Sequence, residues 1–597
     1  MPHDDNKLEL PVPAQDNGQW GSDAIAEMLR LLGLPYIALN PGASYRGLHD
    51  SLVNRLGNRD PQMLLCLHEE AAVAIAHGWA KVKDAPLCAI VHSNVGLMHA
   101  TMAVFNAWCD RAPLLLLGAT GPVDAAKRRP WIDWIHTAKD QGALIRDYTK
   151  WDDQPASVPA AVESLLRAWQ ITQTAPRGPV YVCLDAALQE MRLETAPKMP
   201  DVARFAAPPP ADPPRALLAD AAARLAKARR PLLLMGRMSR SEDHWAARIA
   251  LAEKLGALVL TDMKIAGAFP TTHARHAAAP STFPSEAACT LMREADVIVA
   301  FDWVDLAGTL KSAYGDKDPT ATIVNVTLDQ YLHNGWSMDH QGLPPADLYL
   351  VADPDVTVAA LNGALATHAK GDVWPGWTRP AQVQLPEGEA GAPLTVPVLA
   401  QAVRKGFAGV KTTLMRHPLS WAGHMWDVEH PLDFLGTDGG GGIGSGPGTC
   451  TGSALALKGG DRLPLAILGD GDFLMGATGI WSAVHYGVPM IVFIANNRSF
   501  YNDEVHQERV AKMRDRPVEN KWIGQHIGGP DVDLAMMARS QGATGIGPVF
   551  DVTELREVIP LAIEACRRGE TVVIDVRVEP GYDSGMSSAL VKHVERS

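Results

Sequence analysis

Short apolar runs alternate with helical stretches along most of this 597-residue chain. The clearest case lies in the last third, where residues 463–468 predict a buried strand, residues 473–486 a helix packed on it, and residues 488–495 the next strand. Other apolar runs, such as 113–118, also have strand length, and none approaches the roughly 18 residues of a membrane-spanning helix. The alternation predicts an α/β protein whose mainly parallel sheets are flanked by helices.

Two proline-rich stretches divide the chain. Residues 196–215 contain a Pro-Pro-Pro run and a Pro-Pro pair, and residues 371–397 carry further prolines among several glycines. Such a composition cannot hold a helix or an inner strand. Because the chain is also too long for one hydrophobic core, we expect three domains, at 1–195, 196–370 and 371–597.

The first and third domains share a distant repeat. Residues 89–101 and residues 466–478, which lie 377 positions apart, both read as an apolar strand followed after a short gap by Leu-Met-x-Ala-Thr. A repeat at so long a period indicates a duplicated domain. In this register His92 falls opposite Gly469, so we expect the loop that carries His92 to lie at the carboxyl end of a parallel strand, where such folds bind ligands.

The composition narrows the class of protein. The formal net charge is −13 without a long acidic run, which argues against nucleic acid or an anionic membrane surface as a partner. Seven widely spaced cysteines without a Cys-x-x-Cys pair fit reduced thiols, and the polar N-terminal residues 1–5 are no secretion signal. We therefore expect a cytoplasmic protein with enough hydrophobic residues, 47%, to fill several cores.

An acid and an amide follow two neighbouring strands of the last domain. Asp470 stands in a Gly-Asp-Gly triplet directly after strand 463–468, and Asn497 follows strand 488–495. Because the carboxyl ends of adjacent parallel strands meet at one edge of a sheet, we expect these side chains to converge. Their oxygens suit Mg²⁺, which commonly takes one or two protein ligands together with phosphate oxygens and water. The pair therefore indicates a diphosphate held through a divalent metal.

The triplet and the Asn496-Asn497 pair, separated by 24 residues, resemble the fingerprint of thiamine diphosphate (ThDP) enzymes. The resemblance implies that Gly469 and Gly471 belong to the coenzyme site. It also implies that Asp470, Asn497 and the backbone carbonyl of Ser499 are the protein ligands of Mg²⁺.

The aminopyrimidine end of ThDP needs a carboxylate that can hydrogen-bond to ring atom N1′ from a mostly apolar place. Glu69 fits this need, because it follows a short apolar strand and precedes a helix of small residues. Residues 65–80 resemble the strand-His-Glu pattern of acetolactate synthase, benzoylformate decarboxylase and their relatives, with Trp79 in place of the usual Tyr. The alternative is an acid that is merely favoured near a helix N-terminus.

A glycine-rich loop at 439–446 links the two ends of the coenzyme in this interpretation. Glycines let a backbone pass close to a ligand, and one large apolar side chain among them can act as a wedge. Ile443 resembles the residue that holds ThDP bent in this superfamily, and Gly441 would then offer its carbonyl to the 4′-amino group. A dinucleotide loop is the alternative, but a clean Gly-x-Gly-x-x-Gly after a strand is lacking.

The resemblance covers nearly the whole chain, in the order pyrimidine-binding domain, central domain, diphosphate-binding domain. It implies an active site between the first domain of one subunit and the third domain of another, and hence a homodimer or homotetramer. Some relatives bind FAD or ADP in the central domain. No firm nucleotide fingerprint stands there, so we do not expect FAD, although the sequence leaves it open.

His92 and Asp503 are the candidates for proton transfer on the substrate. Imidazole can exist in both protonation states at working pH, and Asp503 matches in position an acid that pyruvate decarboxylases place over the coenzyme. Glu504 and His506 compete with Asp503 for that role. A core histidine and a solvated helix face are the alternatives.

Several positions depart from the closest patterns. Asn40-Pro41-Gly42 resembles the Asn-Pro-Gly-Ser loop of the family, but Ala43 replaces the serine. The second active-site histidine of benzoylformate decarboxylase has no counterpart after residues 296–301, and the adjacent histidine pair of pyruvate decarboxylases is missing. For Trp131, Trp134 and His136, in a polar loop, we expect surface or interface roles.

The favoured function is a ThDP- and Mg²⁺-dependent lyase or transferase that acts on 2-oxo acids by non-oxidative decarboxylation, carboligation or both. Two alternatives remain. One is a ThDP enzyme with another outcome, such as flavin-linked oxidation or hydrolytic or acyl-CoA carbon–carbon cleavage, and the other is a catalytically silent paralogue. The identity of the substrate cannot be read from the sequence.

Overall fold

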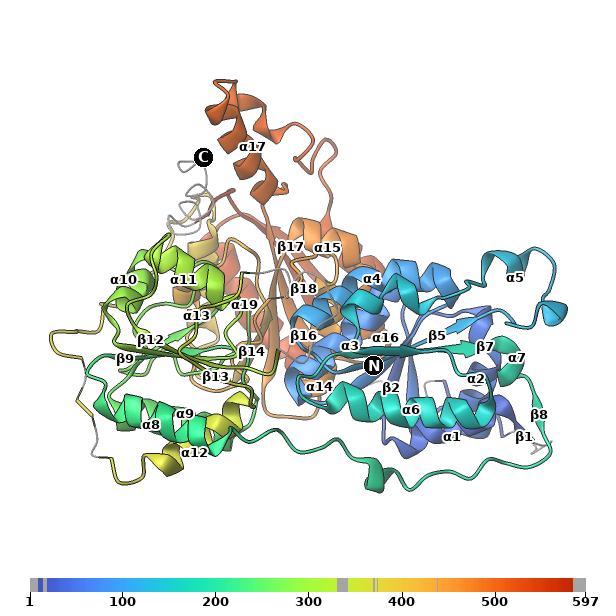
Figure 1. The fold of residues 1–597 in the computed structure, drawn as a ribbon. Coiled ribbons are helices and arrows are strands. Elements are labelled where there is room, and N and C mark those ends of the chain that lie inside the picture. The colour runs from blue at the N-terminus through green and yellow to red at the C-terminus, as the bar shows by residue number, and fades with distance from the viewer. Residues whose placement is uncertain are drawn as a thin grey trace.

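A computed structural model describes residues 9–13, 19–329, 342–368, 371–372, 374–437 and 439–582. Three parallel sheets, one for each predicted domain, carry helices on their faces (Figure 1). A short antiparallel pair, β1 (Gln19–Trp20) with β8 (Arg192–Leu193), closes the first domain. Residues 1–8, which include the segment for which we expected no secretion signal, lie outside the described residues.

The first sheet has the strand order β3-β2-β4-β5-β7-β6. Its strands are β2 (Tyr36–Leu39), β3 (Gln62–Leu65), β4 (Leu87–Ile90), β5 (Leu114–Thr120), β6 (Trp151–Asp153) and β7 (Pro179–Asp185). Its helices are α1 (Gly21–Leu31), α2 (Arg46–Asp50), α3 (Glu69–Lys83), α4 (Ser93–Cys109), α5 (Ile132–Ile135), α6 (Val158–Gln173) and α7 (Ala186–Gln189).

The central sheet has the order β10-β9-β11-β12-β13. Its strands are β9 (Pro231–Met235), β10 (Leu258–Thr261), β11 (Val297–Phe301), β12 (Thr322–Val326) and β13 (Leu348–Leu350). Its helices are α8 (Arg215–Lys227), α9 (Glu242–Leu255), α10 (Glu286–Glu294), α11 (Leu306–Tyr314) and α12 (Pro354–Ala364).

The third sheet has the order β14-β15-β16-β18-β17. Its strands are β14 (Thr412–Arg416), β15 (Leu463–Gly469), β16 (Met490–Asn496), β17 (Thr544–Val549) and β18 (Thr571–Arg577). Its helices are α13 (Val396–Gly406), α14 (Gly446–Leu457), α15 (Asp470–Gly476), α16 (Thr478–His485), α17 (Tyr501–Met513), α18 (Leu534–Ser540) and α19 (Val552–Arg567).

Burial of both sheet faces explains why the strands read as unbroken apolar runs. Along β15, Leu465 and Ile467 enter one hydrophobic core while Ala466 and Leu468 enter the core on the opposite face. Parallel strands covered by helices on both sides need apolar residues at every position, so alternation is lost. All seven cysteines are buried, and none of them forms a disulfide. None of the described helices is long and apolar enough to cross a bilayer.

The predicted duplication is confirmed by strand order. The run β2-β4-β5-β7-β6 in the first sheet has the same pattern of crossovers as β14-β15-β16-β18-β17 in the third. The equivalent helices α3 and α14, each preceding the matched strand, also pack against each other. A Cβ at Gly78 would lie 2.0 Å from the Thr449 carbonyl oxygen, and one at Gly452 would lie 1.9 Å from the Ile75 carbonyl oxygen. Glycine at both positions therefore lets the two helices cross at backbone distance.

The helix predicted at 473–486 differs in detail from the structure. It begins earlier, at Asp470, and is divided into α15 and α16 around Ala477. At the break the backbone passes the glycine-rich loop, since a Cβ at Gly476 would lie 1.8 Å from the Gly444 carbonyl oxygen. The sheets at 36–185, 231–350 and 412–577 each fall inside one predicted domain, while the domain boundaries themselves stay predictions.

Candidate active site

Asp470 and Asn497 follow adjacent strands, β15 and β16, and their side chains converge. The amide N–H of Ser499 donates to Asp470 Oδ2 at 3.2 Å and to Asn497 Oδ1 at 2.9 Å. The other oxygen of Asp470 accepts from the amide of Gly471 at 2.9 Å. An oxygen from each side chain thus lies within hydrogen-bond reach of one atom, an arrangement that a small oxygen-preferring cation can use.

The electrostatic environment of Asp470 favours the binding of a cation beside it. Burial raises the pKa of Asp470 to about 6, and its hydrogen bonds to backbone amides offset only part of that effect. A buried carboxylate near neutrality is stabilised in its charged form by an adjacent positive ion. The donor set, two side-chain oxygens beside a buried backbone turn at Ser499, therefore fits Mg²⁺.

Asp472 connects this edge of the sheet to the glycine-rich loop. Its Oδ1 accepts from the amides of Gly444 at 2.6 Å and Gly446 at 3.2 Å, and its Oδ2 accepts from Arg416 Nε at 2.7 Å. Sequence reasoning missed this role, although Asp472 stands directly after the Gly-Asp-Gly triplet. Its two loop contacts hold the residues around Ile443 beside α15.

The loop also contacts the first domain of the same chain. Asn106 on α4 donates to the Ser445 hydroxyl at 3.2 Å and to the Gly442 carbonyl at 3.4 Å. Gly441 has φ +67°, in the left-handed region that glycine tolerates. Ile443 keeps 38% of its surface exposed, so its apolar side chain remains available to a ligand.

Glu69 is the first residue of α3, and it is 8% exposed. Its Oε2 lies 3.0 Å from Nδ1 of His99 on α4. Gly96 leaves room for the acid, because a Cβ there would lie 3.1 Å from Glu69 Oε1. Proximity to a helix N-terminus alone does not explain such a buried, side-chain-bonded acid. No local motif marked His99 as its partner.

His92 lies in the loop between β4 and α4, as the repeat predicted. Its Nδ1 is 2.9 Å from the Ser44 hydroxyl, and a side chain at Gly42 would collide with its ring. The His136 ring lies edge-on to the His92 ring with centroids 4.6 Å apart. Burial and, second, His136 lower the pKa of His92, while Glu69 opposes the shift.

The contact with His92 adds detail to our expectation of a surface or interface role for His136. The loop of His136 folds back over the first domain, where Asn94 donates to the Ile135 carbonyl at 3.1 Å, so His136 packs inside its own chain as well as lying near the surface. Trp131 and Trp134 are exposed, as expected. The sequence could not predict the contact between His136 and His92, because the path of a loop leaves no periodic pattern in the sequence.

On α17 the structure separates the competing acids. Asp503 is exposed, whereas Glu504 is buried and accepts a hydrogen bond from the Ser499 hydroxyl. Glu504 therefore supports the turn that carries the predicted third metal ligand. Proton transfer on the substrate by His92 and Asp503 stays a prediction.

A cavity of about 400 Å³ lies where the first and central domains meet. Two of the arginines that line it, Arg111 and Arg237, already have acidic partners. Arg111 Nε is 2.9 Å from Asp329, and Arg237 bonds to both Asp329 at 2.6 Å and Asp302 at 3.0 Å. Although burial opposes ionisation, these guanidinium groups hold the pKa of Asp329 well below its usual range. An entering diphosphate would compete with two carboxylates for the same cations.

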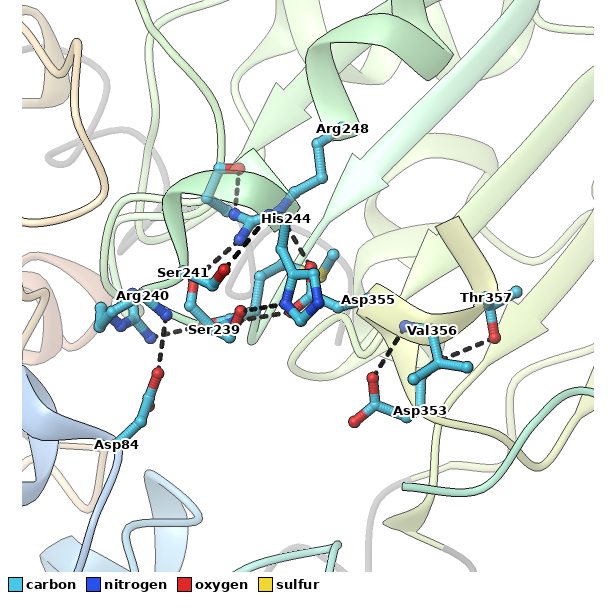
Figure 2. A network of polar contacts seen from close by, with 12 residues as sticks. Asp84, Ser239, Arg240, Ser241, His244, Arg248, Asp353, Asp355, Val356 and Thr357 are labelled. Atoms are coloured by element: carbon cyan, nitrogen blue, oxygen red, sulfur yellow. Dashed lines mark hydrogen bonds and ion pairs between the residues drawn. The ribbon is translucent and has the colours of Figure 1, made fainter. Parts of the chain in front are cut away.

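Figure 2 shows the neighbouring polar network that joins the two domains. Asp84, from the first domain, accepts from the backbone amide of Arg240 at 2.7 Å. Within the central domain, Asp355 accepts from the Ser239 amide at 2.8 Å and from Arg248 Nε at 3.0 Å. The network fixes one wall of the cavity, where Nε and Nη1 of Arg240 are buried without a hydrogen-bond partner among the described residues.

The first domain carries the buried acid Glu69, and the duplicated third domain carries the pair of Asp470 and Asn497. This arrangement indicates a class of proteins that bind a coenzyme between two related α/β domains. Three family models match the chain: the thiamine pyrophosphate enzyme N-terminal TPP-binding domain over residues 19–144, the central domain over 218–361, and the C-terminal TPP-binding domain over 417–576. The chain belongs to the thiamine pyrophosphate (ThDP) enzymes. The predicted resemblance and the predicted fold class are both confirmed.

Individual relatives are distant. Benzoylformate decarboxylase of Pseudomonas aeruginosa is 26% identical over 485 residues, which cover 79% of this chain and 85% of that protein. The acetolactate synthase large subunit of Haemophilus influenzae is 21% identical over 577 residues, 94% of each chain. The crystal structure of benzoylformate decarboxylase from Polynucleobacter necessarius has a TM-score of 0.77 at 19% identity and covers 95% of this chain and 99% of its own.

Proposed function

We propose that this protein is a ThDP- and Mg²⁺-dependent lyase or transferase that acts on 2-oxo acids by non-oxidative decarboxylation, carboligation or both. The observation that carries the proposal is the pairing of a buried acid, Glu69, with the convergent Asp470 and Asn497 oxygens on equivalent edges of duplicated domains. The names of the relatives, benzoylformate decarboxylase and acetolactate synthase, support the substrate class.

In this proposal the third domain holds the diphosphate. Asp470, Asn497 and the Ser499 carbonyl bind Mg²⁺, and Gly469 and Gly471 allow close approach of the backbone. Ile443 supports the bent coenzyme and the Gly441 carbonyl accepts from its 4′-amino group. When bound, ThDP supplies the electron sink for cleavage of the bond next to a carbonyl.

Glu69 holds and exchanges a proton with pyrimidine N1′, for which its buried carboxylate is suited. His92 and Asp503 transfer protons on the substrate-derived part of the site. Ser44 orients the His92 ring through the bond to Nδ1, which leaves Nε2 for that task.

We further propose a cytoplasmic homodimer or homotetramer with active sites between subunits, acting on small molecules rather than on nucleic acid or membranes. We propose no FAD in the central domain, because Arg111 and Arg237 beside the cavity are bound to Asp302 and Asp329. A yellow purified protein with flavin absorbance would contradict this last point.

The proposal is tested by release of CO₂ from a panel of aliphatic and aromatic 2-oxo acids with ThDP and Mg²⁺ present. We expect turnover of at least one of them, loss of turnover without Mg²⁺, and near-complete loss in Glu69→Gln. Lack of turnover across the panel, or an undiminished rate in Glu69→Gln, would reject the proposal.

A further inference from the structure

Two histidines flank Glu69 at the amino end of α3. His68, His99 and Glu69 each offer a ligand atom within 4.8 Å of the others. The rings of His68 and His99 are stacked with centroids 5.3 Å apart and 15° between their planes. Both imidazoles are exposed, while the carboxylate beneath them is buried. The three residues thus form a solvent-accessible group of possible metal ligands, with the carboxylate of Glu69 on its buried side.

We propose that His68, Glu69 and His99 form a binding site for a transition-metal ion such as Zn²⁺, distinct from the Mg²⁺ site, and that this ion competes with ThDP for Glu69. The competition rests on the proposed function, which assigns the Glu69 carboxylate to the coenzyme. The metal site itself rests only on the geometry of these three side chains.

The existing hydrogen bond already has the dimensions of a metal-bridged pair. His99 Nδ1 and Glu69 Oε2 are 3.0 Å apart. Two ligands of a tetrahedral Zn²⁺, with bonds of about 2.0 Å, are separated by about 3.3 Å. The ion can therefore take the place of the shared proton with a small outward shift of the exposed His99 ring.

His68 completes the set by rotation. Its Nδ1 accepts a hydrogen bond from the Glu70 amide at 3.1 Å, at the start of α3. That hydrogen bond is lost if Nδ1 binds the metal ion and is kept if Nε2 binds it. Because the ring is exposed, its rotation disturbs only the stacking on the His99 ring, which itself turns toward the ion. Two histidines and one glutamate, with a water in the fourth position, are a common Zn²⁺ ligand set.

The two metal sites differ in chemistry. Imidazole nitrogens favour Zn²⁺ and its first-row neighbours, whereas the oxygens of Asp470 and Asn497 suit Mg²⁺. Millimolar Mg²⁺ should therefore leave the histidine site free. Zn²⁺ bound there occupies the carboxylate that pyrimidine N1′ would need, so ion and coenzyme exclude each other.

The test uses the full-length protein, without added coenzyme, titrated with Zn²⁺ by calorimetry and with Co²⁺ by visible absorption, which reports the coordination number directly. We expect one ion per chain in the wild type and in the control His49→Gln, whose imidazole lies elsewhere in the first domain. In His68→Gln/His99→Gln affinity should fall at least about tenfold. Equal affinity in the double variant would overturn the site.

A second titration in saturating ThDP and Mg²⁺ tests the competition. We expect apparent Zn²⁺ affinity to fall in proportion to the fraction of protein that is free of coenzyme, and unchanged affinity would overturn that part of the inference. Failure of the 2-oxo acid assay leaves the Co²⁺ spectrum unaffected, so failure of the proposed function and failure of this site are distinguishable.

Discussion

Asp470 and Asn497 accept hydrogen bonds from the same backbone amide, that of Ser499, at 3.2 and 2.9 Å. Two residues from different strands are thereby fixed relative to one turn of the chain. The turn is held in place by Glu504, which bonds to the Ser499 hydroxyl. The side-chain oxygens of Asp470 and Asn497 are therefore held rigidly, and the charge of the set depends on the protonation of Asp470. Coenzyme affinity should depend on both.

Mg²⁺-dependent ThDP binding should weaken in acid. Because burial raises the pKa of Asp470 to about 6, its carboxylate is charged above that pH and becomes neutral below it. A metal ion needs the charged form, so affinity should be constant well above pH 6 and fall by up to about tenfold per pH unit below it. Calorimetric titration of ThDP at fixed Mg²⁺ across this range measures the effect.

Two variants control that experiment. Asp470→Asn should bind weakly because the charged ligand is lost, and equally weakly at every pH because no proton then competes with the metal. Asp461→Asn removes an exposed acid paired with Lys411 and should behave like the wild type. The idea fails if the wild-type affinity shows no dependence on pH.

Glu69→Gln should leave the fold and Mg²⁺ binding intact while it slows hydrogen–deuterium exchange at C2 of bound ThDP by about 10²–10⁴-fold, since an amide cannot cycle the N1′ proton. Quenched-flow exchange followed by NMR measures the rate. Glu163→Gln, at an exposed pair with Arg167, is the matched control. Exchange as fast as in the wild type would remove Glu69 from the role.

His92→Ala and Asp503→Ala should each lower kcat, by about 10²-fold for a proton-transfer group, with hardly any change in ThDP affinity. The reason is that both groups are assigned to the substrate rather than to the coenzyme. Steady-state kinetics with parallel ThDP titrations separate the two effects. Unchanged turnover would mean that His92 is only a histidine of the core and that Asp503, which is exposed on α17, is only a solvated acid.

His136→Ala should move the acid limb of the kcat profile to higher pH. His136 lowers the pKa of His92 by charge repulsion, and loss of its ring also exposes His92 to water, so both effects raise that pKa. A group with a raised pKa is protonated up to a higher pH. Rate profiles of the wild type and the variant over the same pH range provide the comparison, and superimposable profiles would contradict the coupling.

Gly452→Ala should destabilise the protein by at least about 1–3 kcal/mol, because the new Cβ would lie 1.9 Å from the Ile75 carbonyl oxygen where α14 crosses α3. Gly363→Ala is the matched control, since that glycine in α12 faces open space. It should stabilise the helix by about 0.5–1 kcal/mol. Thermal unfolding of the two variants should shift in opposite directions.

The sequence by itself determined the architecture and the positions of the principal acids. Apolar runs buried on both faces identify parallel strands, and a polar residue directly after such a run must lie at the carboxyl edge of a sheet. That local rule places Glu69, His92, Asp470 and Asn497 correctly at strand ends, and the repeat relates the first domain to the third.

The tertiary structure alone decided which side chains meet across that edge. His99 reaches Glu69 from another helix, His136 reaches His92 from a returning loop, and Asp472 bonds to the glycine-rich loop. Such contacts depend on helix rotation, loop path and domain packing, none of which leaves a period in the chain. The burial of Glu504 beside the exposed Asp503 has a similar cause. Both lie on α17, where successive side chains point in different directions, and only the packing of the helix decides which of them is buried.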